Sequence, residues 1–280
     1  MENPSAGCAM ITSRQNPLIQ HARAASKGAA KDTLFIEGLR LCEEAARARL
    51  DCTEVLHTEK LAADARGARL LDDLKQLNPR FTLVGEQILA SLGDTKTPQG
   101  VVLLARRFET DRAAFEKSLR PRPLVVVLNR INNPANAGAM LRVAEAAGAT
   151  GVIATAGTTD LLSPKALRGA MGSSFRLPLW TNADFAEVIS WCRARGVRTV
   201  SADLSAAQTH TELAWTGARA VLMGAEAGGL DETEIRAADE RIRIPMQPPV
   251  ESLNVAVALA VILYEAARQR ARGETMNVEG

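Results

Sequence analysis

Hydrophobic positions in the first third of the chain alternate between short apolar runs and longer stretches with helical spacing. Runs that are typical of strands occupy residues 33–37, 53–57, 81–84 and 101–105. Between them, apolar side chains recur every three or four positions, as in amphipathic helices, in residues 39–50, 61–77 and 86–92. Asn78 and Pro79 end the second of these helices. The pattern predicts a small α/β unit of about 95 residues, an ordinary size for a domain.

A second alternation of strands and helices begins at residue 124. The run at residues 124–128 (LVVVL) is entirely apolar, which is typical of a strand buried on both faces of a parallel sheet. Further strands are predicted at residues 151–154, 198–202, 218–223 and 241–244. Helices are predicted at residues 136–147, 164–171, 185–195 and 252–270. This alternation indicates an α/β fold in which helices cover both sides of a parallel sheet.

A basic stretch that contains prolines separates the two alternations, so two domains are predicted. The first spans residues 11–105, the second spans residues 123–271, and residues 106–122 connect them. The remaining residues, 1–10 and 272–280, are predicted to be tails. The connection carries six lysine or arginine side chains and ends in Pro-Arg-Pro, which favours extended backbone. Its charge is typical of a solvated surface and would also suit a contact with RNA phosphate.

Composition narrows the classes of function. The formal net charge of +2 is too small to indicate nucleic-acid binding by itself, so any RNA surface must be a local patch. Aromatic residues make up only 4%, which argues against a module that stacks bases on aromatic side chains. The longest apolar stretch, residues 255–263, is far shorter than the about 20 residues that cross a membrane. The first residues contain no apolar run, so no signal peptide is expected.

The residues that most often bind metals are scattered. Four cysteines and three histidines occur without CxxC spacing, which argues against a disulfide framework or a metal site. Reduced cysteines of this kind favour a cytoplasmic protein. Two other classes of α/β enzyme are also disfavoured, because the chain contains neither the GxGxxG motif of dinucleotide binding nor the GxxxxGK[ST] motif of P-loop proteins.

Three loops that follow predicted strands have unusual composition. Ligands of parallel α/β sheets bind where loops leave the carboxyl ends of the strands. Residues 129–138 (NRINNPANAG) gather amides and an arginine, residues 223–230 (MGAEAGGL) gather glycines, and residues 244–254 (IPMQPPVESLN) form a rigid entry into the last helix. Each loop alone is also typical of ordinary structure: a polar turn with an asparagine cap, a flexible glycine turn, and Ser252 as a helix cap.

Taken in chain order, the three loops resemble the signature motifs of the SpoU/TrmH family of RNA ribose 2′-O-methyltransferases, within the SPOUT superfamily. The residues that carry the resemblance are Asn136, Gly138 and Arg142, then Gly224, Glu226 and Gly229, and finally Ile244, Pro245, Met246, Ser252, Leu253 and Asn254. One departure is Ala135, where many members have glycine. Upstream, residues 13–17 (SRQNP), 35–38 (FIEG) and 97–100 (TPQG) resemble the substrate-binding domain of that family, a ribosomal-protein-like α/β fold.

The resemblance implies a SPOUT fold with a C-terminal trefoil knot, in which S-adenosylmethionine binds in a bent conformation. It also implies a homodimer in which the first motif of one subunit completes the cofactor site of the other. Cofactor contacts are expected from Gly224, Ile244, Met246 and Leu253, largely through the backbone. RNA contacts are expected from Arg14, Asn16, Glu37 and Arg40, with ribosomal RNA favoured over transfer RNA.

The expected reaction is methyl transfer to a ribose 2′-hydroxyl, and the residues expected to serve it are Arg142, Asn136, Glu226, Ser252 and Asn254. The motifs contain no histidine, so the usual general base is missing, and Glu226 is one titratable candidate. A guanidinium stays protonated at neutral pH, so we expect Arg142 to hold an adjacent phosphate and position the hydroxyl. The proton then goes to phosphate, water or a transiently neutral arginine. A catalytically inactive RNA-binding protein is the alternative, and retention of the five residues argues against it.

Overall fold

The structure is a computed structural model, and it describes residues 10–93, 95, 97–226 and 228–276. The chain forms two compact units. Unit 1 contains the described residues up to Phe108 together with Leu162–Phe175, and unit 2 contains Glu109–Leu161 and the described residues from Arg176 onward. Most of the two predicted tails lies outside the described residues, but the last helix continues to Met276, five residues into the second tail.

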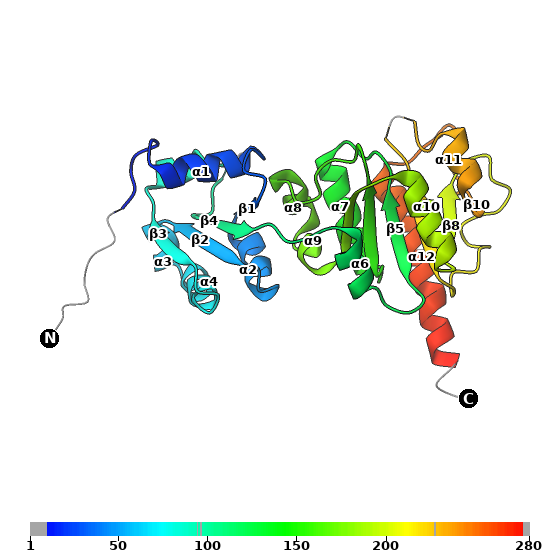
Figure 1. The fold of residues 1–280 in the computed structure, drawn as a ribbon, viewed down its shortest axis with the longest axis horizontal. Helices are drawn as coiled ribbons and strands as arrows, with labels where there is room; N and C mark the ends of the chain where they lie inside the picture. Colours follow the sequence, from blue (N-terminus) through cyan, green and yellow to red (C-terminus); the bar gives the residue numbers. More distant parts are fainter. Residues whose placement is uncertain (1–9, 94, 96, 227, 277–280) are drawn as a thin grey trace. The chain divides into compact units, whose positions relative to one another are not determined.

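Unit 1 is built on a four-stranded sheet in the order β1-β4-β2-β3 (Figure 1). Its strands are β1 (Thr33–Glu37), β2 (Cys52–His57), β3 (Arg80–Leu83) and β4 (Val101–Arg106). Strand β4 is antiparallel to β1 and β2, whereas β2 and β3 are parallel. Its helices are α1 (Pro17–Ser26), α2 (Leu39–Arg47), α3 (Glu59–Ala63), α4 (Ala65–Lys75), α5 (Glu86–Ala90) and α8 (Pro164–Ala170). Helix α1 covers one face of the sheet, and α2 and α4 cover the other (Figure 1).

The helix predicted at residues 61–77 is divided into α3 and α4 at Asp64. This residue has extended backbone, and its carboxylate accepts hydrogen bonds from the N–H groups of Arg66 and Gly67, at 3.0 Å each. A Cβ atom on Gly67 would lie 2.1 Å from the carbonyl oxygen of Leu61, so only glycine allows the two helices to pass this closely. Hydrophobic periodicity does not reveal this break, because the leucines buried by the two short helices keep helical spacing across it.

Unit 2 is built on a six-stranded parallel sheet in the order β10-β8-β9-β5-β6-β7, which confirms the predicted parallel α/β architecture. Its strands are β5 (Leu124–Leu128), β6 (Gly151–Thr155), β7 (Leu179–Ala183), β8 (Arg198–Ala202), β9 (Arg219–Met223) and β10 (Glu240–Ile242). Strand β5 lies in the interior of the sheet, and all five of its residues are fully buried, as its apolar sequence predicts.

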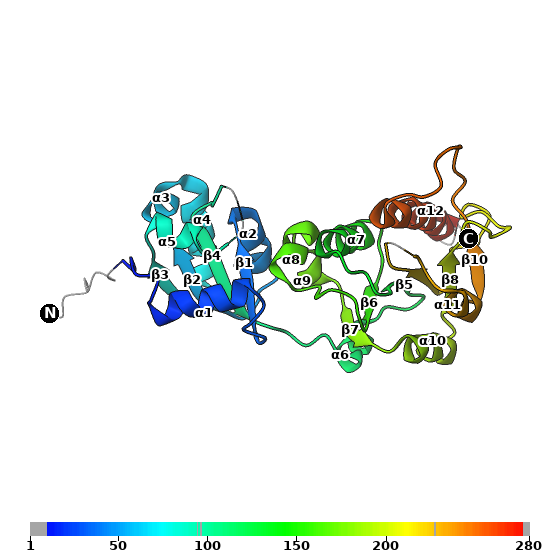
Figure 2. The ribbon, with the colours of Figure 1, turned by 90° about the horizontal axis from the view of Figure 1, so that it is seen from above.

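Helices cover both faces of this sheet. They are α6 (Arg112–Ser118), α7 (Pro134–Ala146), α10 (Phe185–Ala194), α11 (Glu232–Ala237) and α12 (Val255–Met276); the short α9 (Ser173–Arg176) crosses the boundary between the units. Helices α7 and α12 pack together on one side of the strands, and α6 and α10 lie on the other (Figure 2). No helix in the part of the chain that the structure describes has the length and apolar character needed to cross a membrane.

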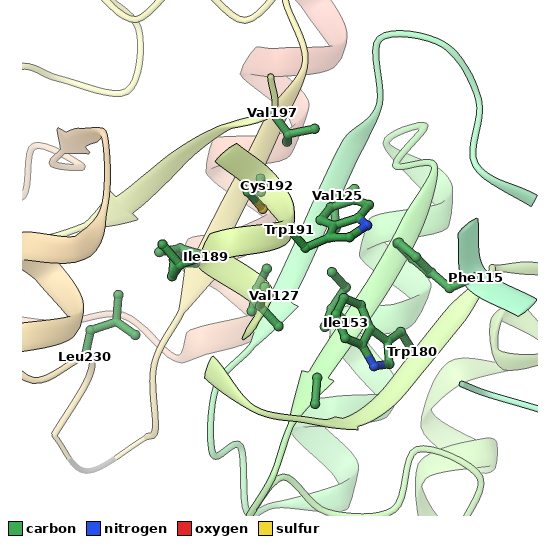
Figure 3. Packing of buried hydrophobic residues seen from close by; sticks show 14 residues of the cluster. Phe115, Val125, Val127, Ile153, Trp180, Ile189, Trp191, Cys192, Val197 and Leu230 are labelled. Carbon is green, nitrogen blue, oxygen red and sulfur yellow. The ribbon is translucent and has the colours of Figure 1, made fainter. Parts of the chain in front are cut away.

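Helix α6 lies within the stretch that was predicted to be a connection. Its Phe115 side chain is fully buried, with its ring 5.6 Å from that of Trp191 and 6.2 Å from that of Trp180 (Figure 3). Asp111 caps the helix by accepting a hydrogen bond from the N–H of Ala114 at 2.8 Å. The basic charge of this stretch indicated a solvated connection. The buried side chain of Phe115 instead makes the stretch part of the core of unit 2.

We expect Phe115→Ala to destabilise unit 2 by about 3–5 kcal/mol, because it leaves a cavity between two tryptophans. All three tryptophans of the chain belong to unit 2, so tryptophan fluorescence during urea denaturation reports on this unit. Leu204→Ala is the matched control, since Leu204 is 59% exposed and its truncation should change stability little. A loss below about 1 kcal/mol for Phe115→Ala would show that α6 is not part of this core.

Candidate active site at the carboxyl ends of β5 and β9

Two of the three loops leave neighbouring parallel strands at the same edge of the sheet. Strands β5 and β9 pair in register, with Leu128 opposite Met223, so the residues that follow them emerge side by side. The N–H of Asn129 donates to the carbonyl oxygen of Met223 at 2.8 Å, which extends the pairing one residue beyond β5. The first and second motifs are therefore brought together by the backbone of the sheet.

The carboxylate of Glu226 connects these two loops. It accepts hydrogen bonds from the N–H groups of Asn132 and Asn133 and from the side-chain amide of Asn136, all at 3.2 Å. The amide of Asn254 in turn donates to Oδ1 of Asn136 at 3.2 Å. One residue from each of the three motifs thus belongs to a single hydrogen-bonded network, although more than a hundred positions separate Asn136 from Asn254.

The environment of Glu226 keeps its carboxylate ionised. Partial burial by itself raises the pKa of this carboxyl, but hydrogen bonds from its own backbone N–H, from Asn136 and from the amides of Asn132 and Asn133 outweigh it. The net effect is a pKa below the usual value. A carboxylate with a lowered pKa is a weak base and a strong hydrogen-bond acceptor, so the geometry favours a positioning role for Glu226 over proton abstraction.

A second, buried network lies beside the first and was missed from the sequence. Oε1 of Glu234 accepts from the side-chain amide of Asn129 at 2.8 Å and lies 2.6 Å from the guanidinium of Arg130. The hydroxyl of Thr155 donates to Oδ1 of Asn129 at 2.8 Å. Asn129 and Glu234 are 1% and 6% exposed, so these polar groups satisfy one another away from water.

The signal that could have identified Glu234 is local. Asp231 and Glu234 form a capping box at the start of α11, in which each side chain accepts a hydrogen bond from the backbone of the other. The Asp-x-x-Glu spacing predicts such a cap, but it does not predict that the same carboxylate also holds the loop after β5. Glu234 therefore fixes the start of the first motif from outside all three motifs.

Gly224 is required by the loop itself. A Cβ atom at this position would lie 2.1 Å from the carbonyl carbon of Gly229 and 2.3 Å from the nitrogen of Leu230. The loop folds back on itself here, with the N–H of Gly229 donating to the carbonyl of Ala225 at 2.8 Å. The sequence leads us to expect a cofactor contact at Gly224, which by itself would make a side chain there a problem only for the ligand. In the structure it would first collide with backbone.

The segment between β10 and α12 leaves backbone groups and apolar side chains without partners among the described residues. Within the described residues, no backbone hydrogen bond involves Ile244, Met246 or Leu253, so their main-chain donors and acceptors remain available. Two apolar side chains of the same segment are uncovered, Val250 at 53% and Leu253 at 37% exposed. Free amide groups beside apolar surface are what a buried adenine needs for recognition through main chain.

The entry into α12 also distinguishes two predicted site residues. Oδ1 of Asn254 accepts a hydrogen bond from the N–H of Ala256 at 2.9 Å, so Asn254 caps the helix while its amide contacts Asn136. Ser252 is exposed and does not serve as the cap. Its hydroxyl remains available for a ligand.

Arg142 is not part of the network. It lies six residues after Asn136 on α7, which places it about 240° further around the helix and on a different face. Its side chain is exposed, and it makes no hydrogen bond or ion pair with another of the described residues. The first motif therefore directs Asn136 toward the other two motifs and Arg142 away from them.

The predicted RNA contacts in unit 1 have different environments. Arg14 and Arg40 are exposed. Asn16 caps α1, its Oδ1 accepting from the N–H of Leu18 at 2.9 Å. Glu37 is only 8% exposed, with a carboxylate that solvent scarcely reaches.

Two sequence motifs of unit 1 meet in space. The side-chain carbonyl of Gln99 accepts from the N–H of Leu39 at 2.8 Å, and a Cβ on Gly38 would lie 3.1 Å from the same oxygen. The FIEG and TPQG segments thus form one structure, in which Gly38 has a φ of 96° that suits glycine.

Metal-binding and disulfide chemistry find no support in the residues that the structure describes. No group of three or more histidine, cysteine or acidic side chains could hold a metal ion among them. The three described cysteines are buried free thiols. Burial raises the pKa of Cys52 to about 11 and that of Cys192 to about 12, so these thiols stay protonated.

Comparison with known families assigns both parts of the sequence. Residues 123–264 match the SpoU rRNA Methylase family, and residues 35–110 match the family described as RNA 2′-O ribose methyltransferase substrate binding. Among curated relatives, an uncharacterised tRNA/rRNA methyltransferase of Synechocystis is 33% identical over 270 residues, 94% of each protein. The 23S rRNA (guanosine-2′-O-)-methyltransferase RlmB of a Burkholderia species is 34% identical over 211 residues, 74% of this chain and 85% of that protein.

Solved structures have the same fold. The SpoU methyltransferase AviRb from Streptomyces viridochromogenes gives a TM-score of 0.80 at 26% identity, covering 92% of this chain and 99% of that one. An rRNA methyltransferase from Sinorhizobium meliloti, solved with AdoMet bound, gives 0.81 at 26% identity and covers 93% of this chain and 97% of that one. These matches confirm the family and the cofactor that the three loops predict. The chain belongs to the SpoU rRNA methylase family of S-adenosylmethionine-dependent RNA 2′-O-ribose methyltransferases.

Proposed function

We propose that this enzyme methylates a ribose 2′-hydroxyl of ribosomal RNA, with its active site at the Glu226–Asn136–Asn254 network. That network is the observation that carries the proposal, because it joins one residue of each motif in one place. The relatives named RlmB and RlmP are 23S rRNA guanosine methyltransferases, which supports ribosomal RNA as the substrate. The buried free thiols are consistent with a cytoplasmic enzyme.

S-adenosylmethionine supplies an electrophilic methyl group on a sulfonium centre. The residues that would hold it are Gly224, Ile244, Met246 and Leu253, through the free backbone and uncovered apolar surface described above. Ser252 contributes a hydroxyl beside them. Glu226 keeps the first and second loops in a fixed relation, so that the cofactor surface is formed before the substrate arrives.

The chain path supports a trefoil knot at the C-terminus. Strand β10 lies at one edge of the sheet, whereas α12 packs against α7, the helix that follows interior strand β5. The segment between β10 and α12 must therefore return past the ends of β8 and β9. The hydrogen bond between Asn254 and Asn136 ties the end of this return to α7. We infer that this return threads the knot of the SPOUT fold.

Arg142 is proposed to act in the site of a second subunit. Its exposed side chain faces away from the network of its own chain, so a partner must supply the cofactor surface that it meets. There the guanidinium holds the phosphate next to the target ribose and directs the 2′-hydroxyl toward the methyl group. Proton loss goes to phosphate, water or a transiently neutral arginine.

A homodimer is supported by the uncovered apolar surface of α12 and the segment before it. Val250, Leu253, Val257 and Tyr264 are among the large exposed hydrophobic side chains of the structure. Val257 and Tyr264 are seven residues apart on α12, which places them on one side of the helix, and Leu253 lies in the segment before it. Large apolar side chains left exposed on one helix face are typical of a protein interface.

Substitution of Glu226 separates a positioning role from a catalytic base. Glu226→Gln keeps an oxygen acceptor for the loop amides, so we expect a loss of kcat of less than about tenfold. Glu226→Ala removes all three hydrogen bonds and should reduce kcat by about tenfold or more and weaken cofactor binding. Single-turnover methyl transfer and calorimetry of S-adenosylmethionine binding measure the two effects. Equal, complete inactivation by both substitutions would instead identify Glu226 as the base.

Removal of Arg142 should abolish turnover without loss of the cofactor. We expect Arg142→Ala to lower kcat by roughly 100- to 1,000-fold, and Arg142→Lys to restore little, because lysine cannot form a bidentate pair with phosphate. Affinity for S-adenosylmethionine should stay within about threefold of wild type, because Arg142 is proposed to hold the phosphate and not the cofactor. An RNA with deoxyribose at the target nucleotide should accept no methyl group. Methylation of that RNA would show that a base is the acceptor.

Polar substitution on α12 tests the dimer. We expect the wild-type protein to have twice the mass of one chain by light scattering, and Val257→Asp with Tyr264→Asp to yield single chains because buried unpaired charge is costly. Leu204→Asp, at an exposed leucine elsewhere in unit 2, should leave the dimer intact. Single chains in the wild-type protein at micromolar concentration would contradict both the dimer and the proposed action of Arg142 across it.

A further inference from the structure

Unit 1 contains a basic cavity of about 370 Å³ whose cationic side chains lie outside the sequence motifs. We name it the α1 pocket. Its walls come from the last turn of α1 and the residue after it, from residues 91–93 after α5, and from α8, all within unit 1. Arg23, Lys27 and Arg168 line it, and none of the described lining residues carries a carboxylate. The pocket therefore has an excess of positive charge in a protein whose overall charge is close to neutral.

Arg168 is held in this pocket by Glu37. The guanidinium lies 3.5 Å from Oε2 of Glu37, and this oxygen accepts no hydrogen bond from the described residues. A Cβ atom on Gly93 would lie 2.2 Å from both carboxylate oxygens, so the backbone at Gly93 covers them. The charge of Glu37 is thus enclosed and compensated by one arginine, because a buried carboxylate needs a cationic partner.

Arg23 is fixed by a different contact. Its Nη2 donates to the hydroxyl of Ser91 at 3.2 Å, and that hydroxyl donates to the carbonyl of Ile88 at 2.7 Å. A guanidinium has five N–H donors, so Arg23 and Arg168 both retain donors beyond these contacts. Lys27 makes no ion pair with another of the described residues. Two oriented guanidinium groups and one ammonium group without an ion pair among the described residues therefore line this cavity.

We propose that the α1 pocket binds a phosphate group of the RNA backbone, with Arg23, Lys27 and Arg168 as its donors. The proposal rests on the proposed function, because it assumes that the substrate is RNA. Guanidinium groups match the oxygens of a phosphate in a bidentate geometry, and an ammonium adds a point charge. Glu37 is then a positioning residue that orients Arg168, and it does not contact RNA itself.

The test compares two double substitutions in the full-length protein. Arg23→Gln with Lys27→Gln removes two cations of the pocket. Arg69→Gln with Lys75→Gln removes one arginine and one lysine from the surface of α4, outside the pocket. The probe is protein-free 23S ribosomal RNA from cells that lack the gene, and its affinity is measured by filter binding over a series of salt concentrations.

We expect the pocket variant to bind this RNA more weakly and to make the dependence of log affinity on log salt less steep by about 0.7–0.9, the value for the one phosphate contact that the pocket makes. The α4 variant should change neither quantity. Because the pocket lies outside the catalytic network, kcat at saturating RNA should stay within about twofold of wild type while KM rises. Equal affinity and slope in the two variants would overturn the proposal.

Inorganic phosphate separates a site for free anions from one for RNA. If phosphate stabilises the wild-type protein against heat, the pocket variant loses this effect, and RNA affinity is unchanged, the pocket takes free anions and the RNA assignment is wrong. Failure of the proposed function is distinguishable, because it appears as a wild-type protein that binds the RNA and transfers no methyl group to it. In that case, comparing the salt dependence of RNA binding in the two variants still tests whether the α1 pocket binds RNA phosphate.

Glu37 and Arg168 are tested as a pair. If Glu37 acts only by orienting Arg168, Glu37→Gln weakens RNA binding in the wild-type background and has no further effect when Arg168→Ala is present. The double variant also avoids leaving a buried charge unpaired, so it guards against loss of folding. An undiminished effect of Glu37→Gln in the Arg168→Ala background would show that Glu37 contacts the RNA directly.

Discussion

The parallel pairing of β5 with β9 is the constraint on which the site depends. Because Leu128 lies opposite Met223, the loops that follow both strands leave the sheet at the same edge and at the same height. Only this register brings the carboxylate of Glu226 within reach of Asn136 and the amides before it. The apolar sequence of β5 fixes the strand in the sheet interior, so the burial of five consecutive residues ultimately positions a polar network.

Three carboxylates in this protein act as hydrogen-bond acceptors or as partners of a cation. Glu226 joins two loops, and Glu234 holds the start of the first motif. Glu37 pairs with Arg168, and its carboxylate is covered by the backbone at Gly93. Each accepts hydrogen bonds or balances a cation, and none is arranged like a general base beside an open cavity. Carboxylates that are already engaged make rigid connections between loops. The proposed contacts with substrate phosphate therefore come from arginine and lysine side chains, and not from these carboxylates.

Elements with a clear apolar pattern could be predicted from the sequence whatever their length, and elements without one could not. Strand β1 was predicted at the residues where it is found, and β5 likewise, because their apolar runs are unbroken. Helix α6 lies in a basic stretch and buries only Phe115, and α11 buries only the polar Glu234. Strand β7 carries the polar Thr181 and Asn182, so none of these three elements shows a clear apolar pattern. The motif residues could be identified, but the reason for Gly224 could not, since it depends on where the backbone of Gly229 returns.

Helix α7 carries two residues of the first motif on different faces, which connects the proposed dimer with the proposed reaction. Asn136 and Arg142 belong to one motif, yet a separation of six residues turns them to different faces of the helix. Within one chain, Asn136 is the residue that turns toward the third motif, through its hydrogen bond to Asn254. If both side chains serve one reaction, the second must come from another copy. The uncovered apolar side chains of α12, which packs beside α7, lie where such a copy could bind.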